Sequence, residues 1–273
     1  MQFVTYNAAQ GLSQNSIYSI AQTKEGFMWF GTQDGLNRFD GKKFYRVIAN
    51  DDSSFNSRRQ LSKMITALYA DSDDWLWVGT SNEIILYNRY TNKFLKPAQV
   101  FPGFSIGSKK WIVKIQEDAN RRIWILTQEN GVFCYDKIKK RMITPLWKQG
   151  KNESCTHIGI NSNGDIIASD KTTLFTNDDG VFTPVKLSPA ISYGITDITD
   201  IAFIGNQIWL LINGRNIIIL ERRNDGAYHA ADFKNIYKSR EYLSDVRIIH
   251  QSDANTVWIG SRTSGLIRVN LLT

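Results

Sequence analysis

Two cysteines, three histidines and no long apolar run limit what this chain of 273 residues is able to be. Cys134 and Cys155 are too few for a disulfide framework, and they lack the spacing of metal ligands. A bridge between them stays conceivable, but free and partly buried thiols are expected. No stretch approaches the roughly 18 apolar residues of a membrane span, and the N-terminus lacks the pattern of a signal peptide.

Catalytic signatures are absent as well. The chain contains no HExxH, GxSxG, GxxxxGK or CxxC motif. Its histidines, His157, His229 and His250, are scattered, and the carboxylate pairs Asp73-Asp74 and Asp178-Asp179 stand in turn sequences. We therefore expect a non-catalytic chain with no cofactor and no metal site.

The charge is basic but dispersed. The chain has 33 Lys and Arg against 26 Asp and Glu, a net charge of +7. This balance favours encounters with acidic ligands, or it is only a margin for solubility. No five basic residues follow one another, so the chain has no arm for nucleic acid and no nucleic-acid partner is expected.

What the sequence does contain is a tryptophan repeat. Five tryptophans follow one another within short apolar segments: Trp29, Trp77, Trp124, Trp209 and Trp258. Their separations are 48, 47, 85 and 49 residues, and Ile167 marks a degenerate copy that divides the long interval into 43 and 42. Repeats of this length that are built only from strands indicate the blades of a propeller.

The first copy shows the four strands of one blade. IYSIAQ, FMWFGT, LNRFD and GKKFYRV are separated by Glu25-Gly26, Asp34-Gly35 and Asp40-Gly41. Glycine accepts the positive φ angles of tight hairpins, so these pairs suit the turns between strands. Trp29 has apolar neighbours on both sides, as expected for a strand that is covered by a blade on each face.

The predicted fold is all-β: one propeller domain, residues 1–273, of six four-stranded antiparallel blades. The blades are expected at about 12–49, 62–96, 110–145, 155–187, 196–234 and 245–273. The last copy has three strands, so residues 2–6 are predicted to add its fourth strand and close the ring. The alternative is six blades of a truncated seven-bladed propeller.

The five tryptophans are expected to be the structural core that joins the blades. Every blade with a tryptophan carries it at the same strand position, which favours packing over a second possibility, stacking on a ligand. Recognition is then expected in the irregular loops between copies.

Residues Gly11 to Val47 resemble the repeat of two-component regulator propellers. The resemblance is carried by Gly-Leu-Ser at 11–13, Trp-Phe-Gly-Thr at 29–32 and Asp-Gly-Leu-Asn-Arg-Phe-Asp at 34–40. Later copies match less well, but all six keep the register. Propellers of this family usually have seven blades, so six copies are a departure from it.

This resemblance implies a non-catalytic sensor in the periplasmic region of a hybrid two-component system, of the kind found in Bacteroidetes. Such propellers recognise a glycan breakdown product and signal through an immunoglobulin-like module to a histidine kinase. The expected partners are an oligosaccharide, an adjoining propeller and that module, with a homodimer in the full-length receptor. The chain would be the first propeller of a membrane-anchored protein.

A propeller sorts its loops onto two faces. The turns between strands two and three share one face with the connections between blades, and these connections are long, basic and aromatic. Arg and Lys pair with carboxylate or sulfate groups, and aromatic rings pack against sugars. The candidate ligand-binding residues are Arg58, Arg59, Lys109, Lys110, Trp111, Trp147, Tyr193, Arg240 and Tyr242. Solvated loop charge, or docking of the next domain, is the other explanation for this face.

Two other functions stay open at this point. A polysaccharide lyase or glycoside hydrolase gathers acids and histidines from several blades around a propeller's channel, which a sequence does not exclude. A protein-interaction platform of the WD-repeat kind is the second, although the Gly-His and Trp-Asp signatures of that family are missing here.

Overall fold

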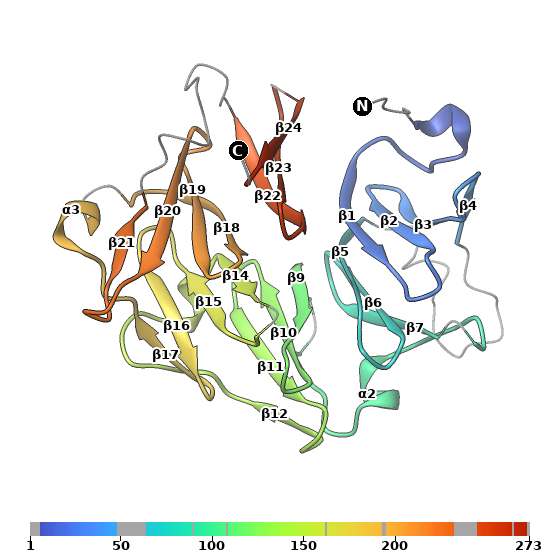
Figure 1. The fold of residues 1–273 in the computed structure, drawn as a ribbon. Coiled ribbons are helices and arrows are strands. Elements are labelled where there is room, and N and C mark those ends of the chain that lie inside the picture. The colour runs from blue at the N-terminus through green and yellow to red at the C-terminus, as the bar shows by residue number, and fades with distance from the viewer. Residues whose placement is uncertain are drawn as a thin grey trace. The chain divides into compact units, whose positions relative to one another are not determined.

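The structure, a computed structural model, describes residues 6–47, 64–88, 90–107, 109–161, 163–192, 195–231, 245–263 and 265–271. These residues are almost entirely strands, which form six sheets (Figure 1). The predicted fold class is confirmed: the chain has the all-β fold of a six-bladed propeller with four-stranded antiparallel blades. Contacts between residues divide it into two compact units, Met1–Thr144 and Pro145–Thr273. Each unit is described by itself, and the single domain over 1–273 stays a prediction.

The first unit holds three blades, and in each the strands are paired in chain order. The first blade contains β1 (Ile17–Gln22), β2 (Met28–Thr32), β3 (Gly35–Phe39) and β4 (Phe44–Arg46). The second contains β5 (Ile65–Ala70), β6 (Trp75–Thr80), β7 (Ile84–Asn88) and β8 (Lys93–Leu95). The third contains β9 (Ile112–Glu117), β10 (Arg122–Thr127), β11 (Gly131–Asp136) and β12 (Arg141–Ile143). The short helices are η1 (Ala8–Gln10) and α2 (Pro97–Val100).

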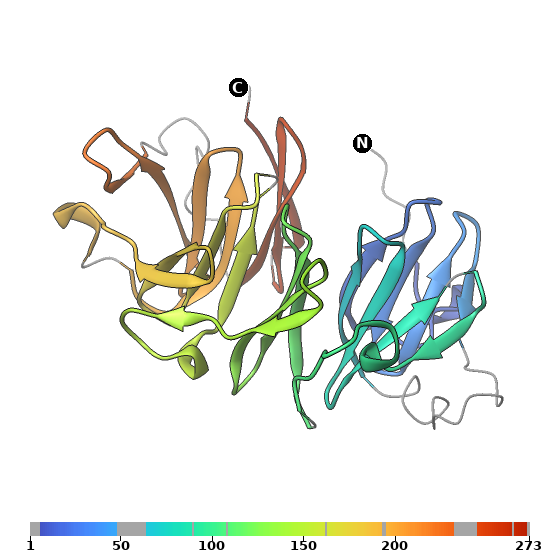
Figure 2. The ribbon, with the colours of Figure 1, turned by 90° about the horizontal axis from the view of Figure 1, so that it is seen from below.

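The second unit holds the other three sheets (Figure 2). The fourth blade contains β14 (His157–Ile160), β15 (Ile166–Ser169), β16 (Leu174–Asp178) and β17 (Val181–Pro184), to which β13 (Leu146–Trp147) adds a parallel fifth strand. The fifth contains β18 (Ile198–Ile204), β19 (Gln207–Ile212), β20 (Asn216–Arg222) and β21 (Tyr228–Ala230). The sixth contains β22 (Val246–Asp253), β23 (Thr256–Ser261) and β24 (Gly265–Asn270). The short helices are η2 (Asn152–Ser154) and α3 (Pro189–Ser192).

The predicted closing strand at 2–6 lies outside the described residues except for Tyr6. That ring packs against Phe39 and Phe44 of the first blade, with centroids 5.1 and 5.7 Å apart. Among the described residues, the sixth sheet has three strands. Closure of the sixth blade by the N-terminus stays a prediction.

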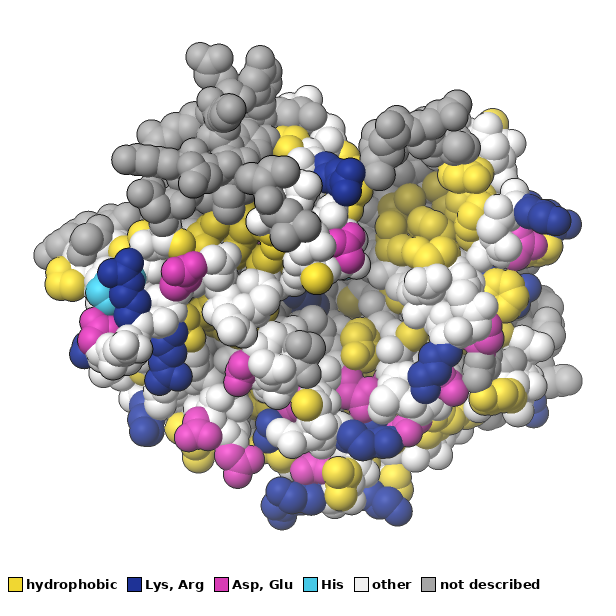
Figure 3. Space-filling model, in the orientation of Figure 1, with side chains coloured by type: hydrophobic (Ala, Val, Ile, Leu, Met, Phe, Trp, Pro, Cys, Tyr) yellow, Lys and Arg dark blue, Asp and Glu magenta, His cyan; other side chains and the backbone are white. Residues whose placement is uncertain are grey.

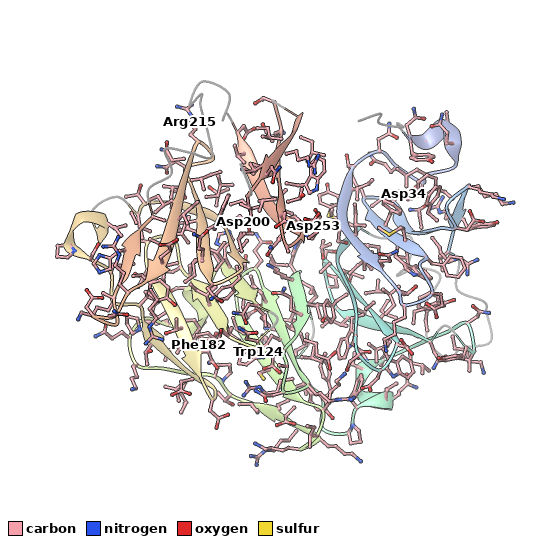
Figure 4. All side chains as sticks on the ribbon, in the orientation of Figure 1. Asp34, Trp124, Phe182, Asp200, Arg215 and Asp253 are labelled. Atoms are coloured by element: carbon pink, nitrogen blue, oxygen red, sulfur yellow. The ribbon has the colours of Figure 1, made fainter. Side chains whose placement is uncertain are left out.

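The tryptophans of the second strands pack between blades. Trp29, Trp77, Trp124 and Trp209 are each at most 2% exposed, and Figure 4 labels Trp124 within its sheet. Trp77 lies in a cluster with Ile112 and Ile115 of the third blade, and its ring stacks on Phe101 at 5.2 Å. In contrast, Trp258 is only half-buried.

Glycine near the end of the second strand lets the next blade come close. A Cβ at Gly31 would lie 2.7 Å from Cγ2 of Ile65, and one at Gly79 would lie 2.7 Å from Cγ2 of Ile112. Real side chains essentially never approach so closely. The Gly-Thr pair of the repeat therefore allows each first strand to pack on the preceding blade.

Threonine at the end of the same strand holds the following turn. Its hydroxyl donates to a backbone carbonyl across the turn: Thr32 to Gly35 at 3.0 Å, Thr80 to Glu83 at 3.1 Å and Thr127 to Gly131 at 3.0 Å. A side chain thus supports turns whose own residues vary between copies.

A carboxylate links the first strands of the fifth and sixth blades. Asp200, labelled in Figure 4, accepts a hydrogen bond from the backbone N–H of Ile249 at 2.9 Å and one from Ile201 at 2.9 Å. Asp200 lies at the register shift between β18 and β19. The irregular step in the ladder thus directs an acceptor toward the neighbouring blade.

Truncation of a second-strand tryptophan tests its share in stability. Trp77→Ala is expected to lower the free energy of unfolding by about 3 to 5 kcal/mol, because it empties a fully enclosed site. Trp258→Ala is the matched variant and should cost clearly less, since its side chain is half-buried. Urea unfolding of both variants measures the difference, and equal losses would contradict the packing role.

Candidate ligand-binding site

The structure sorts the loops as the repeat predicts. Within each unit, the turn between the second and third strands meets the segment that enters the next blade. The backbone N–H of Lys110 donates to the carbonyl of Asn82 at 2.9 Å, that of Ile198 to Lys171 at 2.9 Å and that of Val246 to Gly214 at 2.8 Å. The connections between blades and the turns beside them therefore share one edge of the blades.

Three of the predicted ligand-binding residues form a described loop on this edge. Lys109, Lys110 and Trp111 lie directly before β9, and the Trp111 carbonyl accepts a hydrogen bond from Gln128 at 3.1 Å. Lys109 is exposed and has a φ of 59°, and the Trp111 side chain is 40% exposed. Two cations and an indole thus stand next to the turns that hold Asn82 and Gln128.

The other predicted residues differ in what the structure says of them. Arg58, Arg59, Tyr193, Arg240 and Tyr242 lie outside the described residues, so their part in a site stays a prediction.

Trp147 is held by its own blade. It lies in β13, where its ring stacks on Phe182 with centroids 4.3 Å apart and an interplanar angle of 11°. Its ring also meets Phe175 at 4.9 Å, and Figure 4 labels Phe182 in the same sheet. One face of the indole is therefore occupied by a ring of the protein.

The opposite edge of the first unit carries a buried charge cluster that the sequence analysis did not find. Lys137 Nζ lies 2.5 Å from Glu117, 2.9 Å from Asp73 and 3.4 Å from Asp71. The lysine side chain is 3% exposed, and those of Asp71 and Glu117 are 0% and 6% exposed. We call these four residues the Lys137 cluster, and it joins the second blade to the third.

Most of the acidic residues expected on this edge are paired. Arg121 also binds Asp73, Lys24 lies 3.2 Å from Asp74, and Arg122 Nε lies 2.6 Å from Asp118. On the face drawn in Figure 3, Lys and Arg side chains lie among Asp and Glu side chains rather than apart from them. This edge of the first unit therefore does not present a free acidic field.

The pKa values of the Lys137 cluster follow from burial and pairing. Burial raises the pKa of Asp71. Burial opposes the ionised form of Asp73, but hydrogen bonds from Lys137 and Arg121 lower its pKa overall. Burial likewise opposes the charged form of Lys137, and hydrogen bonds to Glu117 and Asp73 raise its pKa overall. Lys137 is therefore a protonated partner for carboxylates and not a nucleophile.

A cleft of about 250 Å³ adjoins the cluster, and Tyr69, Asp71, Ser72 and Glu117 are among its lining residues. A buried acid of raised pKa beside a cleft is a candidate general acid in many proteins. Here Asp71 accepts from the backbone N–H groups of Asp73 and Trp75, from the indole of Trp77 and from Lys137. These four donors occupy the carboxylate, so its role is structural.

The remaining reactive side chains do not gather into a site. Cys134 and Cys155 are free and buried, and burial raises the pKa of each thiol to about 12. His229 pairs with Asp225 at 2.8 Å on an outer strand. In the part of the chain that the structure describes, three or more His, Cys, Asp or Glu side chains never cluster as metal ligands would. None of its described helices combines the length and the apolar character needed to cross a membrane.

Removal of the central cation tests the Lys137 cluster. Lys137→Met is expected to lower the free energy of unfolding near pH 7 by about 3 to 5 kcal/mol, because it leaves Asp71 and Glu117 buried without their cation. Lys139→Met is the control, since the Lys139 side chain is 58% exposed and should cost under about 1 kcal/mol. Urea unfolding measures both.

The pH dependence of this loss follows from the direction of each shift. Asp73 has a lowered pKa, so its stabilisation is complete above the ordinary value of 3.8 and disappears as the pH falls through the lowered pKa. Lys137 has a raised pKa, so its stabilisation is complete below 10.5 and disappears as the pH rises through the raised pKa. The penalty of Lys137→Met should therefore shrink in acid; a penalty that does not change with pH would contradict the electrostatic account.

Comparison with known proteins agrees with this architecture. The family described as two component regulator propeller matches residues 11–34 and 60–82. A protein named Histidine kinase P4, from Formosa agariphila, is 45% identical over 56 residues, which are 20% of this chain and 4% of that protein. The predicted resemblance is confirmed: the chain carries two-component regulator propeller repeats.

Solved structures share the fold. The extracellular domain of a putative hybrid two component system from B. thetaiotaomicron is 19% identical, with a TM-score of 0.56 over 98% of this chain and 41% of that one. An inactive virginiamycin B lyase from Staphylococcus aureus is 12% identical, with a TM-score of 0.57 over 94% of this chain and 84% of that one. At these identities the likeness concerns the fold alone. The chain spans less than half of the B. thetaiotaomicron domain.

Proposed function

We propose that this chain, which carries the repeats of the two component regulator propeller family, is the ligand-sensing propeller of a hybrid two-component regulator. Its ligand is an oligosaccharide, and it acts without catalysing a reaction. The observation that carries the proposal is the exposed loop Lys109-Lys110-Trp111, which stands on a rigid edge of the blades beside β9. The comparisons support a sensor, since both repeat matches and the B. thetaiotaomicron domain belong to two-component systems.

The chemistry of the loop favours a sugar that carries acidic groups. Two ammonium groups attract carboxylate or sulfate, and an indole that is 40% exposed offers an apolar surface to a sugar ring. The loop begins beside a turn of the preceding blade, so its backbone is held by hydrogen bonds at Lys110 and Trp111. Such support lowers the entropy that is lost when a ligand binds.

In the full receptor the sensor would act outside the cytoplasmic membrane. An adjoining propeller and an immunoglobulin-like module of the same protein would pass the signal to a histidine kinase, in a homodimeric receptor. In this arrangement the ligand changes the receptor only if it binds one signalling state more tightly than the other.

Calorimetric titration with acidic oligosaccharides tests the proposal. The double variant Lys109→Ala, Lys110→Ala and the single variant Trp111→Ala are each expected to weaken binding about 10- to 100-fold, because a hydrogen bond to a charged group contributes about 1.5 to 3 kcal/mol. Lys42→Ala, an exposed lysine in a turn of the first blade, is the control. Unchanged affinity in the loop variants would reject this loop as the site.

Product analysis of the same mixtures separates a sensor from an enzyme. Saturable binding with intact oligosaccharide supports the sensor. Release of unsaturated or hydrolysed products by the purified chain would instead identify a lyase or glycosidase.

A further inference from the structure

The hairpin that precedes each tryptophan differs between the blades of the first unit. In the second blade the indole N–H of Trp77 donates to Asp71 Oδ2 at 2.8 Å, and in the third blade that of Trp124 donates to Asp118 Oδ2 at 2.8 Å. Both aspartates stand six residues before the tryptophan. The two blades thus each supply a carboxylate to the buried indole.

In the first blade Thr23 takes the place of this aspartate. Its backbone N–H closes the same hairpin, donating to Phe27 at 3.1 Å as Asp71 donates to Trp75 at 2.9 Å. Its hydroxyl lies 3.5 Å from the Phe27 carbonyl, and no described residue accepts a hydrogen bond from the indole N–H of Trp29. Trp29 is 2% exposed, so a buried donor is left unsatisfied, which costs free energy.

A guanidinium stands next to this indole. Arg38 on β3 is the direct cross-strand partner of Trp29 on β2, whereas Leu86 and Cys134 face the tryptophans of the second and third blades. Cross-strand partners project to the same side of a sheet. The Arg38 guanidinium lies over the rings of Phe27, at 4.7 Å, and Tyr45, at 5.3 Å.

The third blade shows what such a pair of donors binds. There the Asp118 carboxylate accepts from the Trp124 indole at 2.8 Å and from Arg122 Nε at 2.6 Å. The Arg122 guanidinium also lies over the Trp124 ring, at 5.5 Å. The first blade has the indole and the guanidinium but lacks the carboxylate between them.

A cavity of about 310 Å³ opens at this place, between the first and second blades. Thr23, Phe27, Trp29 and Arg38 line it from the first blade, and Leu76 and Tyr87 line it from the second. Its volume is at the lower end of small-molecule sites, which span about 300 to 1,000 Å³. The cavity therefore has room for a carboxylate and the ring that carries it.

We propose that this cavity binds one uronic acid residue, whose carboxylate takes the position that Asp71 and Asp118 fill in the next two blades. The carboxylate accepts from the Trp29 indole and from Arg38, and the sugar ring packs against Phe27 and Tyr87. Glu25 and Asp74, which also border the cavity, accept hydrogen bonds from the sugar hydroxyls. The choice of a sugar rests on the proposed function, while the carboxylate follows from the repeat.

Indole resonances of the whole chain test the site. The eight tryptophans give eight N–H signals, and Trp29→Phe assigns that of Trp29. Galacturonate and its disaccharide are expected to shift the Trp29 signal in a saturable way, while galactose and benzoate should not. An unmoved Trp29 signal, or an equal response to galactose or benzoate, would overturn the proposal.

Two variants separate binding from folding. Thr23→Asp restores the carboxylate of the other blades, so the chain should be at least as stable in thermal unfolding and should bind galacturonate at least 10-fold more weakly. Thr23→Val, which keeps the size of the side chain, should bind as the native chain does. Arg38→Gln should also lose at least 10-fold. Native-like galacturonate binding by Thr23→Asp would refute the site.

This site and the sensor function fail separately. A Trp29 response to galacturonate that persists in the Lys109→Ala, Lys110→Ala variant supports the cavity whatever the loop binds. An acidic oligosaccharide that binds the chain and leaves the Trp29 signal unmoved rejects the cavity and leaves the sensor function standing.

Discussion

The packing of one blade against the next is the constraint on which the other features of this chain depend. A tryptophan from the second strand fills the space between two sheets, and a glycine two residues later lets the first strand of the next blade approach. Burial of such large side chains supplies most of the stabilisation available to short strands. Loops and turns can then vary, because the blades do not depend on them for contact.

Burial of the indole creates a second requirement, which the blades of the first unit meet differently. Its N–H needs an acceptor, and Asp71 and Asp118 supply one while they also hold their own hairpins. The Lys137 cluster then compensates the charge of Asp71 with a cation from the third blade. In the first blade threonine leaves both the indole and Arg38 without a carboxylate. A recess thus arises from a departure in one copy rather than from an added loop.

The repeat predicted the strands closely, because period, turn chemistry and apolar faces all act locally. IYSIAQ is β1 to the residue, and the predicted edge for the connections is where Lys110 meets Asn82. Trp147 could not be placed in the same way. Its parallel pairing with β17 joins segments about 35 residues apart, and no local pattern reports such a contact. Lys137 was missed because its three carboxylates come from two other hairpins and a strand.

The amino-acid sequence by itself determined the all-β class, the six copies, the position of each tryptophan and the family of the repeat, since these depend on spacing and on the residues of single strands. The tertiary structure alone decided which charges are paired, which indole lacks an acceptor and which loop residues stand exposed. Those properties depend on atoms from different blades that lie within a few ångströms of one another. A short-range interaction between distant parts of the chain has no signature in either part alone.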